Sequence, residues 1–293
     1  MRRLLLIGIA GLFAQPVDGS LGMSYGVSST TLLLAFGAAP ALASASVHIS
    51  EVATTFVSGV SHTRFGNVDW SKVLWMALPG ALGAFLGAVA ISYVAVEVAE
   101  PAVAVFLFLL GVYILSRFGF RKKDEPVRVR PIAAKFLVPL GLVAGFLDAA
   151  GGGGWGPIGS STLLSSGRME PRKVVGTVDT SEFIVTVAGA LGFLLSLSYA
   201  EIPWQVVGAL LAGGIVAAPI AAWLVRLLPA RVMGTLVAGI ILVTNAQTFL
   251  DAVGIGSLVA NVVYAAIVVV CLAAIGFAVW TLRSKQRAEG EPA

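Results

Sequence analysis

The chain has 293 residues, of which 58% are hydrophobic and 12% charged, and its formal net charge is +4. This charged share is about half that of an average soluble domain. Together with a mean hydropathy of +0.94 it excludes a soluble globular protein. With one cysteine, Cys271, and two histidines, the chain has no disulfide framework and too few soft ligands for a typical metal site. We therefore expect no metal and no cofactor.

Uncharged apolar runs recur from one end of the chain to the other. Several of them reach the roughly 20 residues that a helix needs to cross a bilayer. The runs cover residues 73–96, 103–115, 136–147, 206–224, 232–243 and 258–282. They predict an all-α polytopic membrane protein with about 7–9 membrane segments, including a C-terminal transmembrane helix within 251–282 and a cytoplasmic tail at 283–293.

Two parts of the sequence resemble each other at a fixed offset. Residues 22–55 align without a gap with residues 153–186, and ten of these 34 positions are identical. The identities include Pro40 with Pro171 and Glu51 with Glu182. After a slip of three residues, Trp70 aligns with Trp204. We interpret the chain as two homologous membrane repeats, 1–120 and 132–250.

The segment between the repeats, residues 121–131, belongs to the most basic stretch of the chain. A basic run of this kind is typical of a solvated loop, and the positive-inside rule places it in the cytoplasm. Keeping the other basic loops on the same side requires residues 132–167 to enter the membrane and return. Each repeat then has one re-entrant hairpin and three spans, so the second repeat is inverted relative to the first. The alternative is that each broken segment crosses fully and the repeats are parallel.

Each repeat contains a stretch that interrupts its apolar pattern with glycine and ends in hydroxyl residues, at 16–31 and 148–164. Irregular backbone is tolerated in a membrane only where protein buries it or water surrounds it. Such paired breaks therefore indicate a binding site, where free helix amides could hold an anion. The candidate anion-binding residues are Ser28, Ser29, Thr30, Gly153, Gly154, Trp155, Ser160 and Ser161. Trp155 also fits a plain interfacial tryptophan.

Isolated glycines in the run "GALGAFLG" have a simpler interpretation. Gly80, Gly83 and Gly87 recur at helical spacing. Small residues at this spacing let membrane helices approach one another closely. We expect these three glycines to serve helix packing.

Few acids fall within the membrane segments, and ionisable groups there are functional candidates. They are Asp18, Glu51, Asp148, Asp179 and Glu182. Glu51 with Glu182 and His48 with Asp179 occupy matched repeat positions, one helical turn apart. We assign His48, Glu51, Asp179 and Glu182 as candidate coupling or gating residues. For "DTSE", Asp179 to Glu182, a helix-capping box is an equal alternative.

These features together resemble the TauE/SafE family of sulfite and sulfonate exporters. The resemblance rests on the paired glycine breaks with Ser/Thr starts, the polar segment "VDTSEFIVTVAGALG" and the element "GNVDW" with Trp70. It covers about residues 11–249. The family implies export of a small sulfur-containing anion, such as sulfite or an organosulfonate, across the bacterial cytoplasmic membrane, with the protein as a multi-pass component of the inner cell membrane.

The sequence therefore predicts a secondary transporter that works by alternating access, and not an enzyme. A monoanion leaving an inside-negative cell gains about 2.3 kcal/mol per 100 mV, which favours export. A passive anion channel is the alternative, and an intramembrane enzyme is a weaker one, since no nucleophile or metal-binding motif is present. Expected partners are the small anion and the lipid bilayer, with no nucleic acid. A homodimer is compatible with the sequence.

Overall fold

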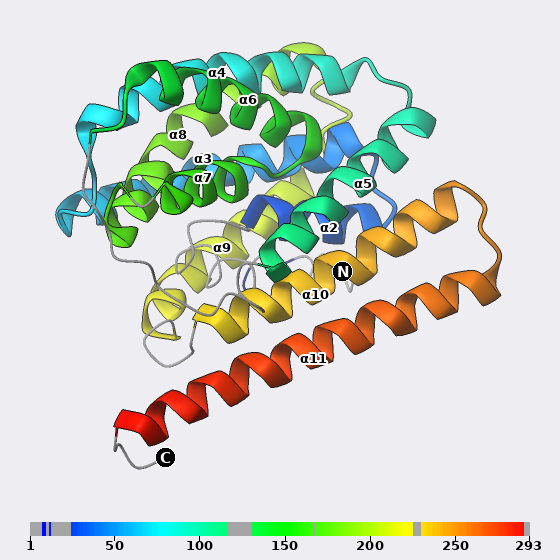
Figure 1. The fold of residues 1–293 in the computed structure, drawn as a ribbon. Helices are drawn as coiled ribbons and strands as arrows, with labels where there is room; N and C mark the ends of the chain where they lie inside the picture. The colour runs from blue at the N-terminus through cyan, green and yellow to red at the C-terminus, as the bar shows by residue number, and fades with distance from the viewer. Residues whose placement is uncertain are drawn as a thin grey trace.

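A computed structural model of the chain describes residues 8–9, 12, 25–116, 131–166, 168–224 and 230–289. Within these ranges every regular element is a helix (Figure 1). The basic linker 121–131 falls outside the described residues except for its last position, as do Asp18 and the end of the tail.

The helices follow one another with short connections. Their bounds are α2 (Tyr25–Ala35), α3 (Pro40–Arg64), α4 (Trp70–Ser92), α5 (Val96–Leu115), α6 (Ala134–Gly151), the π-helical turn η2 (Trp155–Ser160), α7 (Ser161–Ser165), α8 (Pro171–Ser196), α9 (Trp204–Leu224), α10 (Ala230–Ala252) and α11 (Ser257–Glu289).

Five of the described helices are long and apolar enough to cross a membrane, which confirms a multi-pass helical membrane protein. These spans are Trp70–Ser92, Val96–Leu115, Ala134–Gly151, Lys173–Ser196 and Leu258–Thr281. The last of them, within the predicted C-terminal helix, is 12% buried. The total of about 7–9 segments, which counts re-entrant and shorter pieces, stays a prediction.

Equivalent helices of the two predicted repeats begin at equivalent residues. Helix α3 begins at Pro40 and α8 at Pro171, and proline suits a first helical turn because its missing N–H has no partner there in any case. Helix α4 begins at Trp70 and α9 at Trp204. The first pair of starts is separated by the same offset as the aligned sequences, and the second pair includes the three-residue slip.

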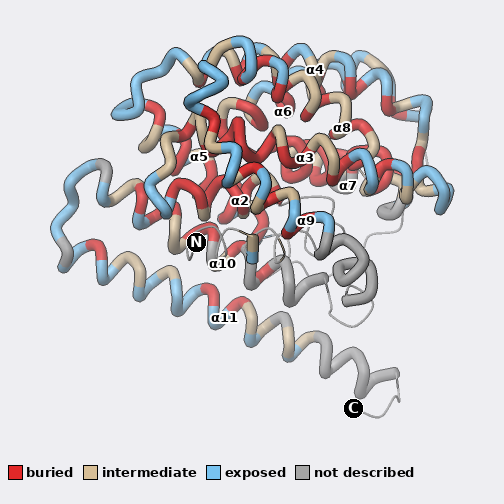
Figure 2. The backbone as a smooth tube through the Cα atoms, turned by 180° about the vertical axis from the view of Figure 1, so that it is seen from behind, coloured by how far each residue is buried: buried red, intermediate tan, exposed pale blue. Residues whose placement is uncertain are grey.

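The polar helices α3 and α8 lie against each other in the interior (Figures 1 and 2). Thr55 of α3 meets Thr186 of α8, whereas His48, earlier in α3, meets Phe193, later in α8. The two helices therefore run antiparallel. Figure 2 shows buried residues concentrated along them, while α11 stands at the edge and packs against α10.

Glycines bring α4 and α6 into backbone contact. A Cβ atom on Gly83 would lie 2.1 Å from the Leu142 carbonyl oxygen, and one on Gly87 would lie 2.3 Å from that of Phe146. The same holds from the other side, since a Cβ on Gly145 would lie 2.1 Å from the Gly80 oxygen. Since no side chain fits at these positions, the glycines serve helix packing, as their spacing predicts.

Replacing Gly83 by alanine is therefore expected to destabilise the protein. Overpacking of this kind costs roughly 1–3 kcal/mol, which exceeds the gain in helix propensity from alanine. Gly208→Ala on α9 is the matched control, because no atom lies within 4 Å of its Cβ position. Thermal unfolding in detergent should show a lower Tm for Gly83→Ala only, and equal Tm values would contradict this packing.

Candidate functional site

The second break is built on glycines that no other residue replaces easily. Gly152 ends α6 with φ 71° and Gly153 follows with φ 154°, both in the region that L side chains avoid. A Cβ on Gly153 would lie 2.3 Å from the backbone nitrogen of Val27. Glycine is therefore required here by backbone angle and by close approach, which explains the glycine run.

The chain reverses direction at this break. Met76 of α4 lies against Gly141 in α6 and also against Gly159 in η2, on the far side of the break. The segment after the break therefore returns alongside α6, as in a hairpin. This is the geometry expected of a re-entrant segment, although the side of the membrane from which it enters stays a prediction.

The two breaks touch each other in the interior. A Cβ on Gly26 at the start of α2 would lie 3.2 Å from the Gly153 Cα and 3.3 Å from the Glu51 Oε1 atom. The Thr30 hydroxyl donates a hydrogen bond to the Gly152 carbonyl. The structure thus places the starts of the two interrupted helices side by side, with a buried carboxylate next to them.

One carboxylate holds the backbone of the second break. Asp148 Oδ1 accepts hydrogen bonds from the amides of Gly154, at 2.7 Å, and Trp155, at 3.0 Å. The Gly153 amide donates to the Asp148 carbonyl oxygen at 2.9 Å. All three amides predicted to bind an anion are therefore already bonded within the protein. An incoming anion would have to displace the side chain of Asp148 to use them.

The hydroxyls of the first break are in a different situation. The Oγ atoms of Ser28 and Ser29 are buried and have no hydrogen-bond partner within the described structure. Buried hydroxyls are normally bonded, so two unbonded ones beside the break are unusual. Ser160 and Ser161 of the second break are also buried, but both interact within the protein.

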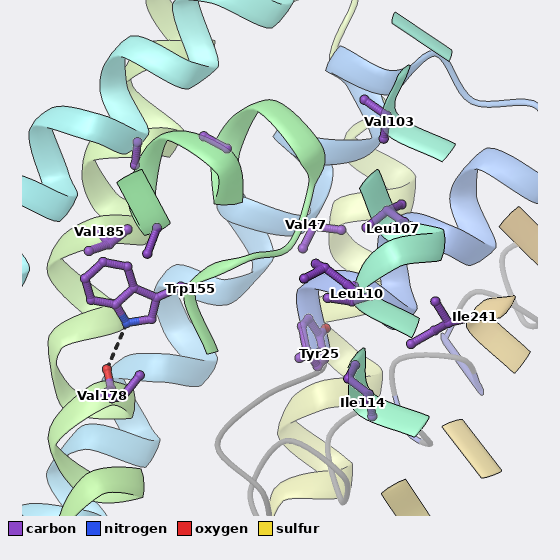
Figure 3. Packing of buried hydrophobic residues seen from close by; sticks show 14 of the residues in the cluster. Tyr25, Val47, Val103, Leu107, Leu110, Ile114, Trp155, Val178, Val185 and Ile241 are labelled. Carbon is purple, nitrogen blue, oxygen red and sulfur yellow. Dashed lines mark hydrogen bonds between the residues drawn. The ribbon is translucent and has the colours of Figure 1, made fainter. Parts of the chain in front are cut away.

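Trp155 is a wedge inside the bundle and not an interfacial residue. It is fully buried, and its indole N–H donates to the Val178 carbonyl at 3.0 Å (Figure 3). A Cβ on Gly80 would lie 2.4 Å from the indole ring, and Val185 lies beside it. The ring thus fills the space between α4 and α8, which fixes η2 to both helices.

The four candidate coupling residues are all buried along α3 and α8. His48 Nε2 lies 3.2 Å from Asp148 Oδ2 of α6, while Asp179 Oδ2 lies 3.5 Å from His62 Nε2. Glu51 and Glu182 also interact within the protein. Because Asp179 lies well inside α8, a capping box at "DTSE" is wrong.

Sequence reasoning missed two contributors to this region. His62 ends the same face of α3 as His48, and that spacing was a usable signal. Asn245 of α10 donates a hydrogen bond of 2.8 Å to the Thr31 hydroxyl and so ties α10 to α2. Nothing in the sequence pointed to this contact. Among the residues that the structure describes, no three His, Cys, Asp or Glu side chains are placed to hold a metal ion.

Interrupted helices that meet inside a multi-pass helical bundle, surrounded by buried ionisable side chains, are typical of secondary membrane transporters. The comparisons with known proteins agree. The chain belongs to the TauE/SafE family, because the family model described as "Sulfite exporter TauE/SafE" matches residues 7–248.

Two proteins of Bacillus subtilis (strain 168) are similar to the chain. The "Probable membrane transporter protein YtnM" is 50% identical over 278 residues, which cover 94% of this chain and 93% of that protein. The "Probable membrane transporter protein YdhB" is 28% identical over 178 residues, covering 60% and 71% respectively. Both names indicate a membrane transporter and not an enzyme. No solved structure matches the chain.

Removing the Asp148 side chain is expected to destabilise the second break. Asp148→Ala leaves two buried amides without an acceptor, at a cost of about 1–3 kcal/mol for each. Asp148→Asn keeps a carbonyl oxygen and should lose less. The exposed acid Asp251 on α10 provides the control variant Asp251→Ala. Thermal unfolding in detergent should rank the Tm values as control, then Asn, then Ala, and an unchanged Tm for Asp148→Ala would refute this role.

Proposed function

We propose that the chain is a secondary transporter that exports a small anion of the sulfite or organosulfonate class across the cytoplasmic membrane. The observation that carries the proposal is the contact between the two breaks, with the unbonded hydroxyls of Ser28 and Ser29 beside it. The outward direction follows the family description, which names a sulfite exporter.

Alternating access in this proposal comes from two inverted repeats that move relative to each other. Three observations support inverted repeats. Helices α3 and α8 begin at equivalent prolines, they run antiparallel, and the equivalent residues Thr55 and Thr186 face each other at 3.4 Å. A residue that meets its own repeat partner marks an internal two-fold axis, and antiparallel equivalent helices place that axis in the membrane plane.

The anion in this proposal is held at the contact between the breaks. Hydroxyl and amide donors suit the oxygen atoms of sulfite or a sulfonate, and they bind an anion without a buried arginine. Ser28, Ser29 and Thr30 supply donors from the first break. Gly153, Gly154, Trp155, Ser160 and Ser161 belong to the second. His48, Glu51, Asp179 and Glu182 then govern access or coupling.

Flux into proteoliposomes tests the proposed function. The purified protein should carry sulfite or isethionate, a two-carbon sulfonate, with a saturable rate and with counterflow when unlabelled anion is present on the opposite side. An ohmic, non-saturable conductance would indicate a channel instead. The absence of any flux above empty liposomes for both anions would contradict the proposal.

The double variant Ser28→Ala/Ser29→Ala should weaken binding without weakening the fold. Its hydroxyls make no hydrogen bond within the protein, so their loss costs little stability. Two neutral hydrogen bonds to the anion, at about 1 kcal/mol each, correspond to a roughly 30-fold higher KM. The exposed Ser116 provides the control Ser116→Ala. An unchanged KM together with an unchanged Tm would remove these serines from the site.

A further inference from the structure

Helices α3 and α8 meet along a continuous polar seam. On α3, polar residues recur alternately every four and three positions, so they lie along one face of the helix. They are Ser44, His48, Glu51, Thr55, Ser58 and His62. On α8 the facing residues Asp179, Glu182 and Thr186 follow the same spacing. A polar interface this long is costly inside a membrane protein and points to a function.

The seam has an inner pair that needs a proton. His48 Nδ1 lies 3.0 Å from the Ser44 carbonyl oxygen, which can only accept, so Nδ1 carries the hydrogen. The other nitrogen, Nε2, lies 3.2 Å from Asp148 Oδ2, and neither atom has a hydrogen-bond partner. In a neutral imidazole, Nε2 is then an acceptor that faces another acceptor. One added proton between the two atoms turns this contact into a charge-assisted hydrogen bond.

The seam also has an outer pair close to the protein surface. His62 Nε2 lies 3.5 Å from Asp179 Oδ2, and the His62 side chain is 17% exposed while that of Asp179 is 2% exposed. The Asn67 side-chain amide lies 3.5 Å from His62 Nδ1, on the opposite side of the ring. His62 therefore connects water to a buried carboxylate, and histidine exchanges protons near neutral pH.

The inner pair is connected directly to the second break. The same Asp148 carboxylate that faces His48 also accepts from the amides of Gly154 and Trp155. A proton shared with His48 offsets the charge of Asp148, which weakens its hold on those amides. The proton state of the pair and the state of the break are therefore linked through one side chain.

We propose that anion transport is coupled to a proton, which exchanges with water at His62 and Asp179 and is bound between His48 and Asp148. This inference rests on the proposed function. Because the bound proton offsets the Asp148 charge before the anion arrives, proton and anion move together. For a monoanion the coupled step is electroneutral, so its direction follows the anion and proton gradients and not the membrane potential.

Other charges near the two pairs do not provide a competing proton site. Around His48, α3 and α8 contribute Glu51 and Glu182, which interact within the protein, and the described apolar part of α9 contributes no ionisable group. Around His62, the Lys173 ammonium of α8 is bonded to the carbonyls of Gly66 and Val68. The remaining neighbours are Arg64 on α3 and the Asp69–Lys72 ion pair at the start of α4.

Isethionate accumulation in proteoliposomes tests the coupling, because this anion keeps one negative charge at every pH used. With a gradient of one pH unit and no membrane potential, one-to-one coupling should accumulate isethionate tenfold on the alkaline side. A potential of 100 mV without a pH gradient should accumulate none. Uncoupled movement would give the reverse, with a roughly 50-fold ratio from the potential alone.

Variants assign the coupling to the two pairs. Asp148→Asn should abolish accumulation driven by the pH gradient, while the control Asp251→Asn should accumulate isethionate tenfold, as the wild type does. His62→Gln should reach the same final ratio at least tenfold more slowly, because it removes proton exchange with water and not the inner site. An Asp148→Asn protein that still accumulates tenfold, or a His62→Gln protein with an unchanged rate, would overturn the assignment.

The outcomes separate this inference from the proposed function. Isethionate that follows the potential and ignores the pH gradient would overturn the coupling and leave anion transport standing. If neither isethionate nor sulfite moves, the proposed function fails first. If only sulfite moves, wild type and Asp148→Asn are compared with sulfite, and an equal dependence of the two on the pH gradient overturns the coupling.

Discussion

The structure depends on how a break in a membrane helix keeps its backbone polar groups bonded. In a bilayer such groups have no water to turn to, and each unbonded one costs several kcal/mol. Asp148 solves this problem for the second break by accepting from the amides of Gly154 and Trp155. The break is therefore stable only while this carboxylate faces it, and anything that changes the charge of Asp148 acts on the break.

Asp148 also connects three parts of the bundle that are distant in sequence. Its backbone belongs to α6, its Oδ1 atom holds η2, and its Oδ2 atom faces His48 of α3. Trp155 extends the connection, because its indole fixes η2 to Val178 of α8 (Figure 3). A displacement of α3 relative to α6 is then felt at the break, which is the kind of linkage that alternating access requires.

Sequence patterns predicted the helical membrane class, the glycine packing of α4 and the resemblance between equivalent segments, since these follow from local composition and spacing. They also predicted the breaks themselves. They did not predict which histidine meets which acid. His48 meets Asp148 and His62 meets Asp179, and both contacts depend on how helices far apart in the chain cross. Periodicity gives the face of a helix but not its neighbour, so the matched pair His48 and Asp179 proved to have separate partners.

Two helix interfaces of the same protein show where stability and function are divided. Between α4 and α6, glycines such as Gly83 and Gly145 bring backbones together, and this arrangement serves tight packing. Between α3 and α8, the same membrane environment contains acids, histidines and hydroxyls, and Asp179 Oδ2 has no hydrogen-bond partner there. A fold shaped only for stability would have used small apolar residues at both interfaces. The polar seam is therefore best explained by ions that bind along it and are released, since an interface that must change its bonding cannot have every bond already made.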